Sequence, residues 1–152
     1  MSPWRRRFLW SLGVIGMVYG IVVADVLLRG REAYLEGEKY WRWSEHPEER
    51  RAYVEAQTAP ARARLDRRHA EGALDDETYA RDLELLQFDR EQRLKESTIK
   101  YAYAWYQTAA DLFTPPESKW TRLSRQKMPL AKERWKAELR AQGIPVAEYR
   151  ID

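Results

Sequence analysis

The sequence predicts an all-α protein with a single N-terminal transmembrane helix, an extramembrane helical hairpin that contains one long helix, and a short C-terminal helix. One supporting observation is a long apolar run near the N-terminus. The other is the helical spacing of apolar residues in polar segments that glycine and proline separate. The chain accordingly divides into a cytoplasmic flank with the anchor (1–28), membrane-proximal helices (29–60), the hairpin (61–114) and a basic tail with a short helix (115–152).

The apolar run is long enough to cross a bilayer. It extends from Phe8 to Leu28, and its one charged residue is Asp25. At ~1.5 Å per residue, a helix of this length spans the ~30 Å hydrocarbon core. The run is long for a cleaved signal peptide, and the twin-arginine export pattern lacks its usual polar residue because Trp4 stands there. We therefore expect a permanent anchor.

Charges at the two ends of the anchor predict its orientation. Arg5, Arg6 and Arg7 precede the run, whereas Arg29 and Arg31 follow it and are themselves followed closely by acidic residues. Because cytoplasmic flanks carry the excess of lysine and arginine, the three N-terminal arginines indicate a cytoplasmic N-terminus. We expect a single-pass protein of the bacterial inner membrane whose C-terminal part is periplasmic.

Small residues form a stripe along the anchor. Gly13, Gly16, Gly20 and Ala24 recur at spacings of three and four, which places them on one helix face where a second helix can approach closely. Asp25 comes next, near the far boundary, where it reaches headgroups or water or pairs with a basic group of a neighbouring protein. We expect these five residues to pack against other membrane-protein subunits.

The membrane-proximal region is expected to be helical with one break. Helical spacing continues after the anchor, so the helix runs out of the bilayer as far as "SEHPEE". There Ser44 is placed to cap a new helix, with Pro47 in its first turn. This helix is predicted over about 46–57 and is expected to stop before the proline of "TAP" at 58–60.

The predicted hairpin begins with a helix over 61–71. Gly72 supplies a left-handed stop, and Asp75 or Asp76 caps the helix that follows. Because no further glycine or proline occurs before Pro115, this second helix is expected to run ~38 residues and ~57 Å.

One stretch of the hairpin resembles known families. Residues 64–86, "RLDRRHAEGALDDETYARDLELL", resemble the short helix–turn–helix of the SHOCT (short C-terminal) domain. They are also similar to the stretch after the membrane anchor in cytochrome c maturation factors of the haem-lyase-associated type. The resemblance implies an interaction or oligomerisation hairpin without catalysis, and it rests on Leu65, Gly72, Leu74, Asp75, Asp76, Glu77, Tyr79, Leu83 and Leu86.

Aromatic residues are concentrated in "YAYAWY", residues 101–106. Tyr101, Tyr103, Trp105 and Tyr106 would face several sides of a helix, so they cannot all lie in a two-helix seam. Either they build a local core with the tail, in which Trp135 is the nearest candidate contact, or they mark a contact with a partner protein.

The tail carries the basic excess of the extramembrane part. Residues 115–152 hold 9 Lys and Arg against 5 Asp and Glu, whereas residues 29–114 hold 15 against 18. A short helix is predicted from Pro129 to about residue 142, ended by Gly143. Such a basic helix can lie on anionic lipid, dock on an acidic protein or simply face water. The excess is small and no nucleic-acid module accompanies it, so no nucleic-acid partner is expected.

The sequence offers little for catalysis. It has no cysteine, which excludes disulfides, thiolate chemistry, iron–sulfur clusters and covalent haem attachment. His46 and His69 stand in polar surroundings without metal-ligand spacing, and no phosphate-binding glycine loop or serine elbow occurs. We expect no enzymatic activity, cofactor, metal or small-molecule substrate.

Two functions fit these features. The first is a non-catalytic accessory or structural subunit of a large bacterial membrane complex, of the respiratory or photosynthetic electron-transport type. Its partners would be the lipid bilayer and other membrane-protein subunits. The alternative is a membrane-anchored assembly or scaffolding factor of the cytochrome-maturation type. The glycine stripe and surplus aromatic residues favour the first, and the hairpin resemblance favours the second.

Overall fold

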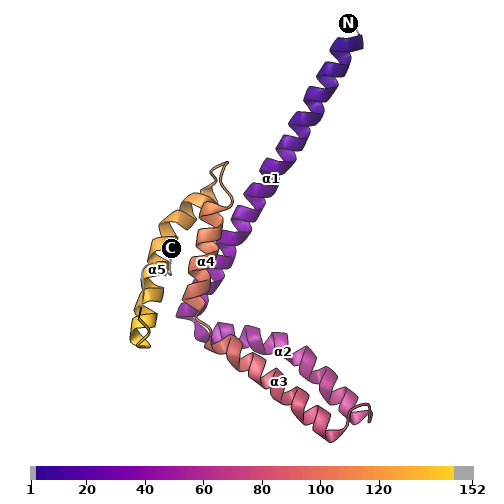
Figure 1. Ribbon diagram of the computed structural model, residues 1–152, viewed down its shortest axis with the longest axis vertical. Helices are drawn as coiled ribbons and strands as arrows, with labels where there is room; N and C mark the ends of the chain where they lie inside the picture. Colours follow the sequence, from indigo (N-terminus) through magenta and orange to yellow (C-terminus); the bar gives the residue numbers. More distant parts are fainter. Residues whose placement is uncertain (1–2, 146–152) are drawn as a thin grey trace. The chain divides into compact units, whose positions relative to one another are not determined.

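The computed structural model describes residues 3–145 and confirms the all-α class, because it contains five helices and no strand within that range. In chain order the helices are α1 (Pro3–Glu45), α2 (Pro47–Ala70), α3 (Asp76–Lys95), α4 (Thr98–Asp111) and α5 (Lys119–Ala141) (Figure 1). They form two compact units. The first, the three-helix unit, contains α1 up to Tyr40 with α4 and α5, and the second, the hairpin unit, extends from Trp41 to Thr98.

In the three-helix unit, α4 runs antiparallel to α1. A Cβ built on Gly30 would lie 3.3 Å from Cβ of Phe113, and one built on Gly37 would lie 2.6 Å from Cε1 of Tyr106. Later residues of α4 and the loop after it therefore contact earlier residues of α1. Both glycines let an aromatic side chain approach the α1 backbone where any larger residue would intervene.

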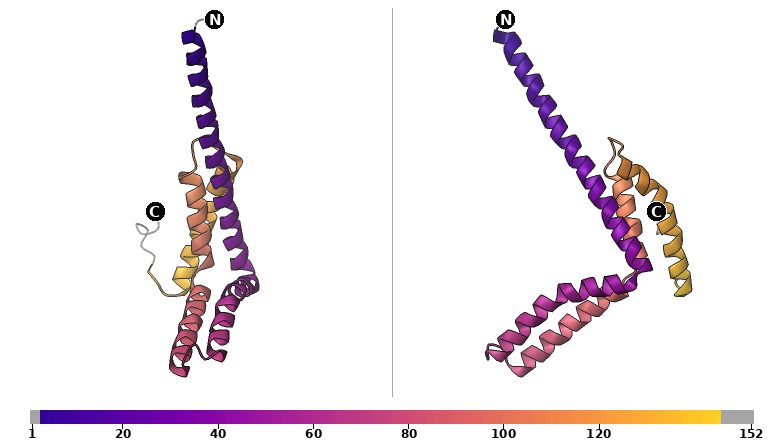
Figure 2. Two further views of the ribbon diagram at one scale, coloured as in Figure 1. Left: turned by 90° about the vertical axis from the view of Figure 1, so that its right-hand side faces the viewer. Right: turned by 180° about the vertical axis from the view of Figure 1, so that it is seen from behind.

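Helix α5 returns alongside the other two helices. The ring of Trp120, near its start, lies 5.4 Å from the ring of Tyr34, and Nζ of Lys127, two turns later, lies 3.1 Å from Oε1 of Glu38. Thus α5 runs in the same direction as α1, as Figure 2 shows for this unit. The core between the three helices is built mainly from small and aromatic residues: Ala33, Ile99, Ala102, Tyr103, Tyr106, Ala109, Ala110, Thr121, Ser124 and Ala131.

The hairpin unit pairs α2 with α3. Gly72 follows the end of α2 with φ of +72°, the left-handed conformation that its lack of a side chain permits. Asp75 caps α3 by accepting a hydrogen bond from the backbone N of Thr78 at 2.7 Å. Both features confirm the prediction for this turn.

Helix α2 differs from the prediction in being continuous. The expected helices over 46–57 and 61–71 form one helix with Pro60 inside it. An interior proline costs a helix ~3 kcal/mol. Contacts of α2 with α3 on both sides of the proline, through Glu55 with Arg90 and Asp66 with Tyr79, favour the continuous form. The prediction that Ser44 caps this helix was also wrong, because its Oγ donates to the carbonyl of Trp41 at 2.6 Å and His46 holds the N-cap position. Pro47 does occupy the first turn, as predicted.

The predicted long helix of the hairpin is broken in the structure. Helix α3 ends at Lys95, and Glu96 takes an extended conformation with ψ of 141°. The guanidinium of Arg50 donates to the carbonyls of Arg93 and Glu96, which supplies partners for groups at the end of α3. The hairpin is therefore α2 with α3, and the helix after Ser97 belongs to the other unit.

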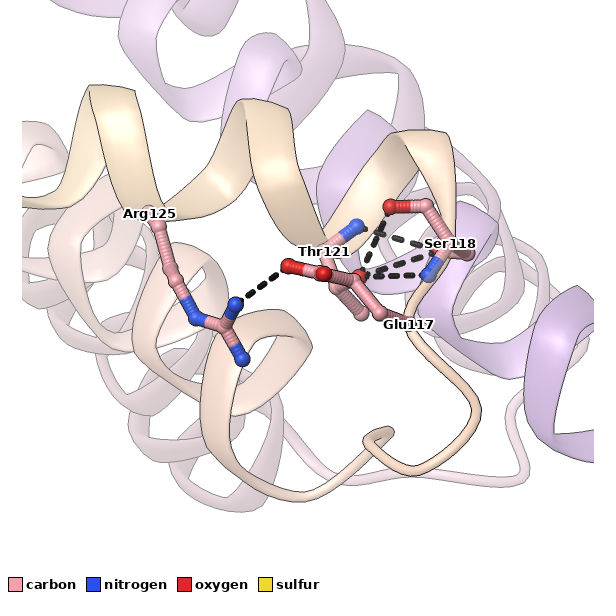
Figure 3. Close-up of polar contacts among 4 residues, drawn as sticks. All are labelled: Glu117, Ser118, Thr121 and Arg125. Atoms are coloured by element: carbon pink, nitrogen blue, oxygen red, sulfur yellow. Dashed lines mark hydrogen bonds and ion pairs between the residues drawn. The ribbon is translucent and has the colours of Figure 1, made fainter.

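The C-terminal helix begins ten residues before the predicted start at Pro129. Ser118 and Thr121 form a capping box: the N of Thr121 donates to Oγ of Ser118 at 3.1 Å, and the N of Ser118 donates to Oγ1 of Thr121 at 2.8 Å (Figure 3). This reciprocal pairing satisfies two backbone donors and starts α5 at Lys119. Gly143, with φ of +71°, follows its end as predicted.

Candidate functional site

The strongest candidate for function is the apolar part of α1. Among the described residues, α1 is the one helix long and apolar enough to cross a membrane. From residue 10 to residue 22 every residue is exposed, with Trp10 at 72% and Tyr19 at 71%. Water is an unfavourable environment for so continuous an apolar surface, so either lipid or other protein helices are expected to cover it.

The stripe of small residues on this helix faces open space. A Cβ built on Gly13, Gly16 or Gly20 meets no atom within 4 Å among the described residues, and Ala24 is exposed. The structure therefore leaves the predicted packing face available to another helix. The backbones of Arg5, Arg6 and Arg7 lie in α1, but their side chains lie outside the part of the chain that the structure describes.

Asp25 forms an ion pair within its own helix. Its Oδ2 accepts from Nε of Arg29 at 2.7 Å, and both side chains are more than half exposed. The spacing of four residues brings the two side chains together on one helix face. From the sequence, the expected partner of Asp25 was headgroups, water or a basic group of a neighbouring protein, whereas the structure supplies Arg29 of the same helix.

Two of the aromatic residues predicted to contact a partner are buried in the three-helix unit. Tyr106 is 0% exposed, and its hydroxyl donates to Oε1 of Glu38 at 2.6 Å. Tyr103 is also buried, with its ring 5.9 Å from that of Trp135 on α5. A local core with the tail, one of the two alternatives left open by the sequence, describes Tyr103, whereas Tyr106 is buried against α1.

Tyr101 and Trp105 are partly exposed and lie at different places in the unit. The ring of Tyr101 stacks on Tyr40 at 5.2 Å. Trp105 lines a cavity of about 440 Å³ whose other lining residues are Arg29, Glu32, Ala33, Leu35, Glu36 and Phe113. The lining contains no serine, threonine, cysteine or histidine that could serve as a nucleophile or general base.

The hairpin unit holds a second cavity, of about 390 Å³, between α2 and α3. Glu55 and Arg90 face each other there, with Nε of Arg90 3.1 Å from Oε1 of Glu55. The hydrogen bond from Arg90 lowers the pKa of Glu55 below its ordinary value. This arrangement joins the two helices and is typical of a structural ion pair.

Neither histidine lies in a candidate metal site. Nε2 of His69 lies 2.8 Å from Oδ1 of Asp76, and its ring stacks on Tyr79 at 4.2 Å. Nδ1 of His46 lies 3.3 Å from one carboxylate, that of Glu48. Within residues 3–145 no group of three histidine, cysteine, aspartate or glutamate side chains is placed to hold an ion.

Sequence reasoning did not single out the loop between α4 and α5 as a surface. Leu112, at its start, is 73% exposed, and Trp120, at its end, packs on Tyr34. The available signal was the apolar pair Leu112–Phe113, one residue before two prolines and followed by Lys119 and Trp120. What the exposed side chain of Leu112 could contact depends on which part of α1 the loop lies beside.

Comparison with known proteins adds no further constraint. No family model, curated protein or solved structure matches the chain. The resemblance of residues 64–86 to two families stays a prediction.

Proposed function

We propose that the protein is a non-catalytic, single-pass accessory subunit of a larger bacterial membrane complex, anchored in the inner membrane with its N-terminus in the cytoplasm. The observation that carries this proposal is the contrast between two parts of α1. Residues 30–40 pack against α4 and α5 of the same chain, whereas the apolar residues before them have an open glycine face. The protein thus presents a helix suited to packing against a partner within the bilayer.

The extramembrane helices support a structural role. Their polar side chains pair with one another, as in Arg90 with Glu55 and Arg125 with Glu117. The one hydroxyl group that lines the hairpin cavity, that of Thr58, donates to two backbone carbonyls of its own helix, and Glu55 there pairs with Arg90. Such units are suited to holding neighbouring subunits in position.

An assembly or scaffolding factor is the second candidate. The observation that favours it is an exposed apolar pair on the hairpin, Leu85 and Phe88, one turn apart on α3. Exposed apolar side chains at this spacing provide a surface for a transient protein contact. A subunit stays stoichiometric with its complex after detergent extraction, whereas an assembly factor does not.

The test is replacement of Gly16 and Gly20 by leucine, followed by copurification from solubilised native membranes. The two larger side chains would fill the open face and keep a partner helix away, so the partner proteins should be lost. The matched control replaces Val14 and Val18, which have the same spacing on the opposite face, by leucine and should retain them.

Mass spectrometry of the retained proteins would identify the complex and show whether it belongs to electron transport. Retention of the same partners by the glycine double variant would mean that the stripe faces lipid. The proposal would then lose the observation that carries it.

A further inference from the structure

The loop between α4 and α5, residues 112–118, lies beside the point where α1 leaves its apolar run. Phe113 packs against Gly30. A Cβ built on Gly30 would also lie 3.8 Å from the methyl carbon Cγ2 of Thr121. Gly30 follows Leu28, the last residue of the apolar run, by two residues, or ~3 Å along the helix axis. Figure 1 shows the loop between α4 and α5 beside α1. If α1 crosses a bilayer with its apolar run, this loop therefore lies at the level of the lipid headgroups.

The side chain at the start of the loop is unusually exposed for its type. At 73%, Leu112 is more exposed than any other large apolar side chain in residues 29–145. Its neighbour Phe113 points to α1 and is partly covered. The loop thus presents one uncovered apolar side chain, that of Leu112, where it leaves α4, while the next side chain packs against α1.

Aromatic and basic groups lie at the other end of the loop, where α5 begins. Trp120 packs on Tyr34, with Cζ of Arg31 5.9 Å and Nζ of Lys119 5.1 Å from its ring centroid. Tryptophan and tyrosine are enriched at both faces of a bilayer, where long basic side chains also extend toward the headgroups. The grouping is therefore suited to the interfacial layer of a membrane.

The loop is held in place by its own hydrogen bonds. The capping box of Ser118 and Thr121 closes its end, and Arg125 pairs with Glu117 one residue earlier (Figure 3). Ser118 and Thr121 are both buried. Because the loop is already held by these contacts, little conformational entropy would be lost when Leu112 enters the bilayer.

From this geometry we infer that the α4–α5 loop is a second membrane contact, which inserts Leu112 into the interfacial region of the bilayer that α1 crosses. The inference rests on the proposed membrane span of α1. Acidic Asp111 and Glu117 stand at the two ends of the loop, and basic Lys119 follows. Because these charges have mixed sign, the contact depends on the apolar side chain of Leu112 and does not require anionic lipid. Two points of attachment would fix the three-helix unit against the membrane surface.

The absence of native cysteine allows a direct test with the full chain. Single-cysteine variants Leu112→Cys, Val18→Cys and Leu130→Cys would each carry the environment-sensitive fluorophore NBD and be reconstituted in phosphatidylcholine vesicles, with and without nitroxide-labelled lipid. Val18 reports on the membrane span. Leu130 is the matched control, because it is also exposed but lies ~14 Å further along α5 than Thr121.

The inference predicts a blue-shifted emission and quenching by nitroxide lipid at positions 112 and 18, and neither effect at position 130. Vesicles that also contain phosphatidylglycerol should give the same result. Water-like emission at position 112 with lipid contact at position 18 would overturn the loop contact and leave the span intact. Water-like emission at both would overturn the span itself. A blue shift at 112 without lipid quenching would indicate cover by a second copy and would also overturn the inference.

Discussion

The residue that decides the spacing of α1 and α4 is Gly37. Its missing side chain leaves room for the ring of Tyr106, whose Cε1 and Cδ1 atoms would lie 2.6 and 2.7 Å from a Cβ. Tyr106 is buried and donates to Glu38, so its ring is held by a hydrogen bond as well as by packing. A closely packed interior cannot accept extra atoms at such a point without moving its neighbours.

Replacement of Gly37 by valine is predicted to destabilise the three-helix unit by about 1–3 kcal/mol, the usual cost of overpacking a core. Chemical unfolding of the full chain in detergent, followed by circular dichroism, would measure the change. Gly13→Val is the matched control, because a Cβ there meets nothing within 4 Å, and its midpoint should stay close to that of the wild type. Equal midpoints for the two variants would contradict this account of the α1–α4 contact.

At the scale of elements, charged side chains join the hairpin helices. Arg90 on α3 pairs with Glu55 on α2, and Asp75 caps α3 through the N of Thr78. The hydrogen bond from Arg90 lowers the pKa of Glu55, and that from the Thr78 backbone lowers the pKa of Asp75. Each carboxylate is therefore more acidic in the folded hairpin than in the unfolded chain.

The stability of the hairpin is predicted to fall in acid. A carboxyl whose folded pKa is lowered contributes fully above its unfolded pKa, about 3.9 for aspartate and 4.3 for glutamate, and its contribution is lost as pH falls through the lower folded value. Thermal unfolding of the full chain at a series of pH values would show this decline.

In the same experiment, the variant Asp75→Asn distinguishes the contribution of the capping hydrogen bond to stability from that of the negative charge. Asparagine caps helices about as well as aspartate but does not titrate, so the variant should keep its stability at neutral pH and show a shallower decline in acid. A pH dependence identical to that of the wild type would exclude Asp75 as a contributor.

At the scale of the whole molecule, the charges that flank the apolar part of α1 predict on which side of a membrane the helical units would lie. Three arginines precede the apolar run, while Arg29 after it is paired with Asp25 and Arg31 is followed by Glu32. The N-terminal flank therefore carries the stronger positive charge, which favours retention in the cytoplasm.

The predicted topology can be checked with a membrane-impermeant maleimide on spheroplasts. A cysteine at Ala73, which is exposed in the hairpin turn, should be labelled on intact spheroplasts. One at Ser2 should be labelled only after lysis. The reverse pattern would assign the helical units to the cytoplasm and would leave the membrane span itself intact.

Local features of the fold were predictable from short stretches of sequence. The apolar run, the left-handed stop at Gly72 and the cap at Asp75 each depend on a few neighbouring residues, through hydropathy, backbone conformation or a hydrogen bond three residues away. For the same reason the end of α1 near His46 was anticipated. The open glycine face was recognised as a stripe, because helical spacing alone places its residues together.

The partners of the helices were decided by contacts between distant residues. Gly30 and Gly37 are seven residues apart on α1, and Tyr106 and Phe113, which fill the spaces they leave, are seven apart in α4 and the loop after it. This match pairs α4 with α1, whereas the sequence had suggested that α4 continues α3. Packing along a neighbour also keeps α2 intact at Pro60, against its local preference. Tertiary packing prevails in these cases because burial along a whole helix outweighs the preference of a single residue.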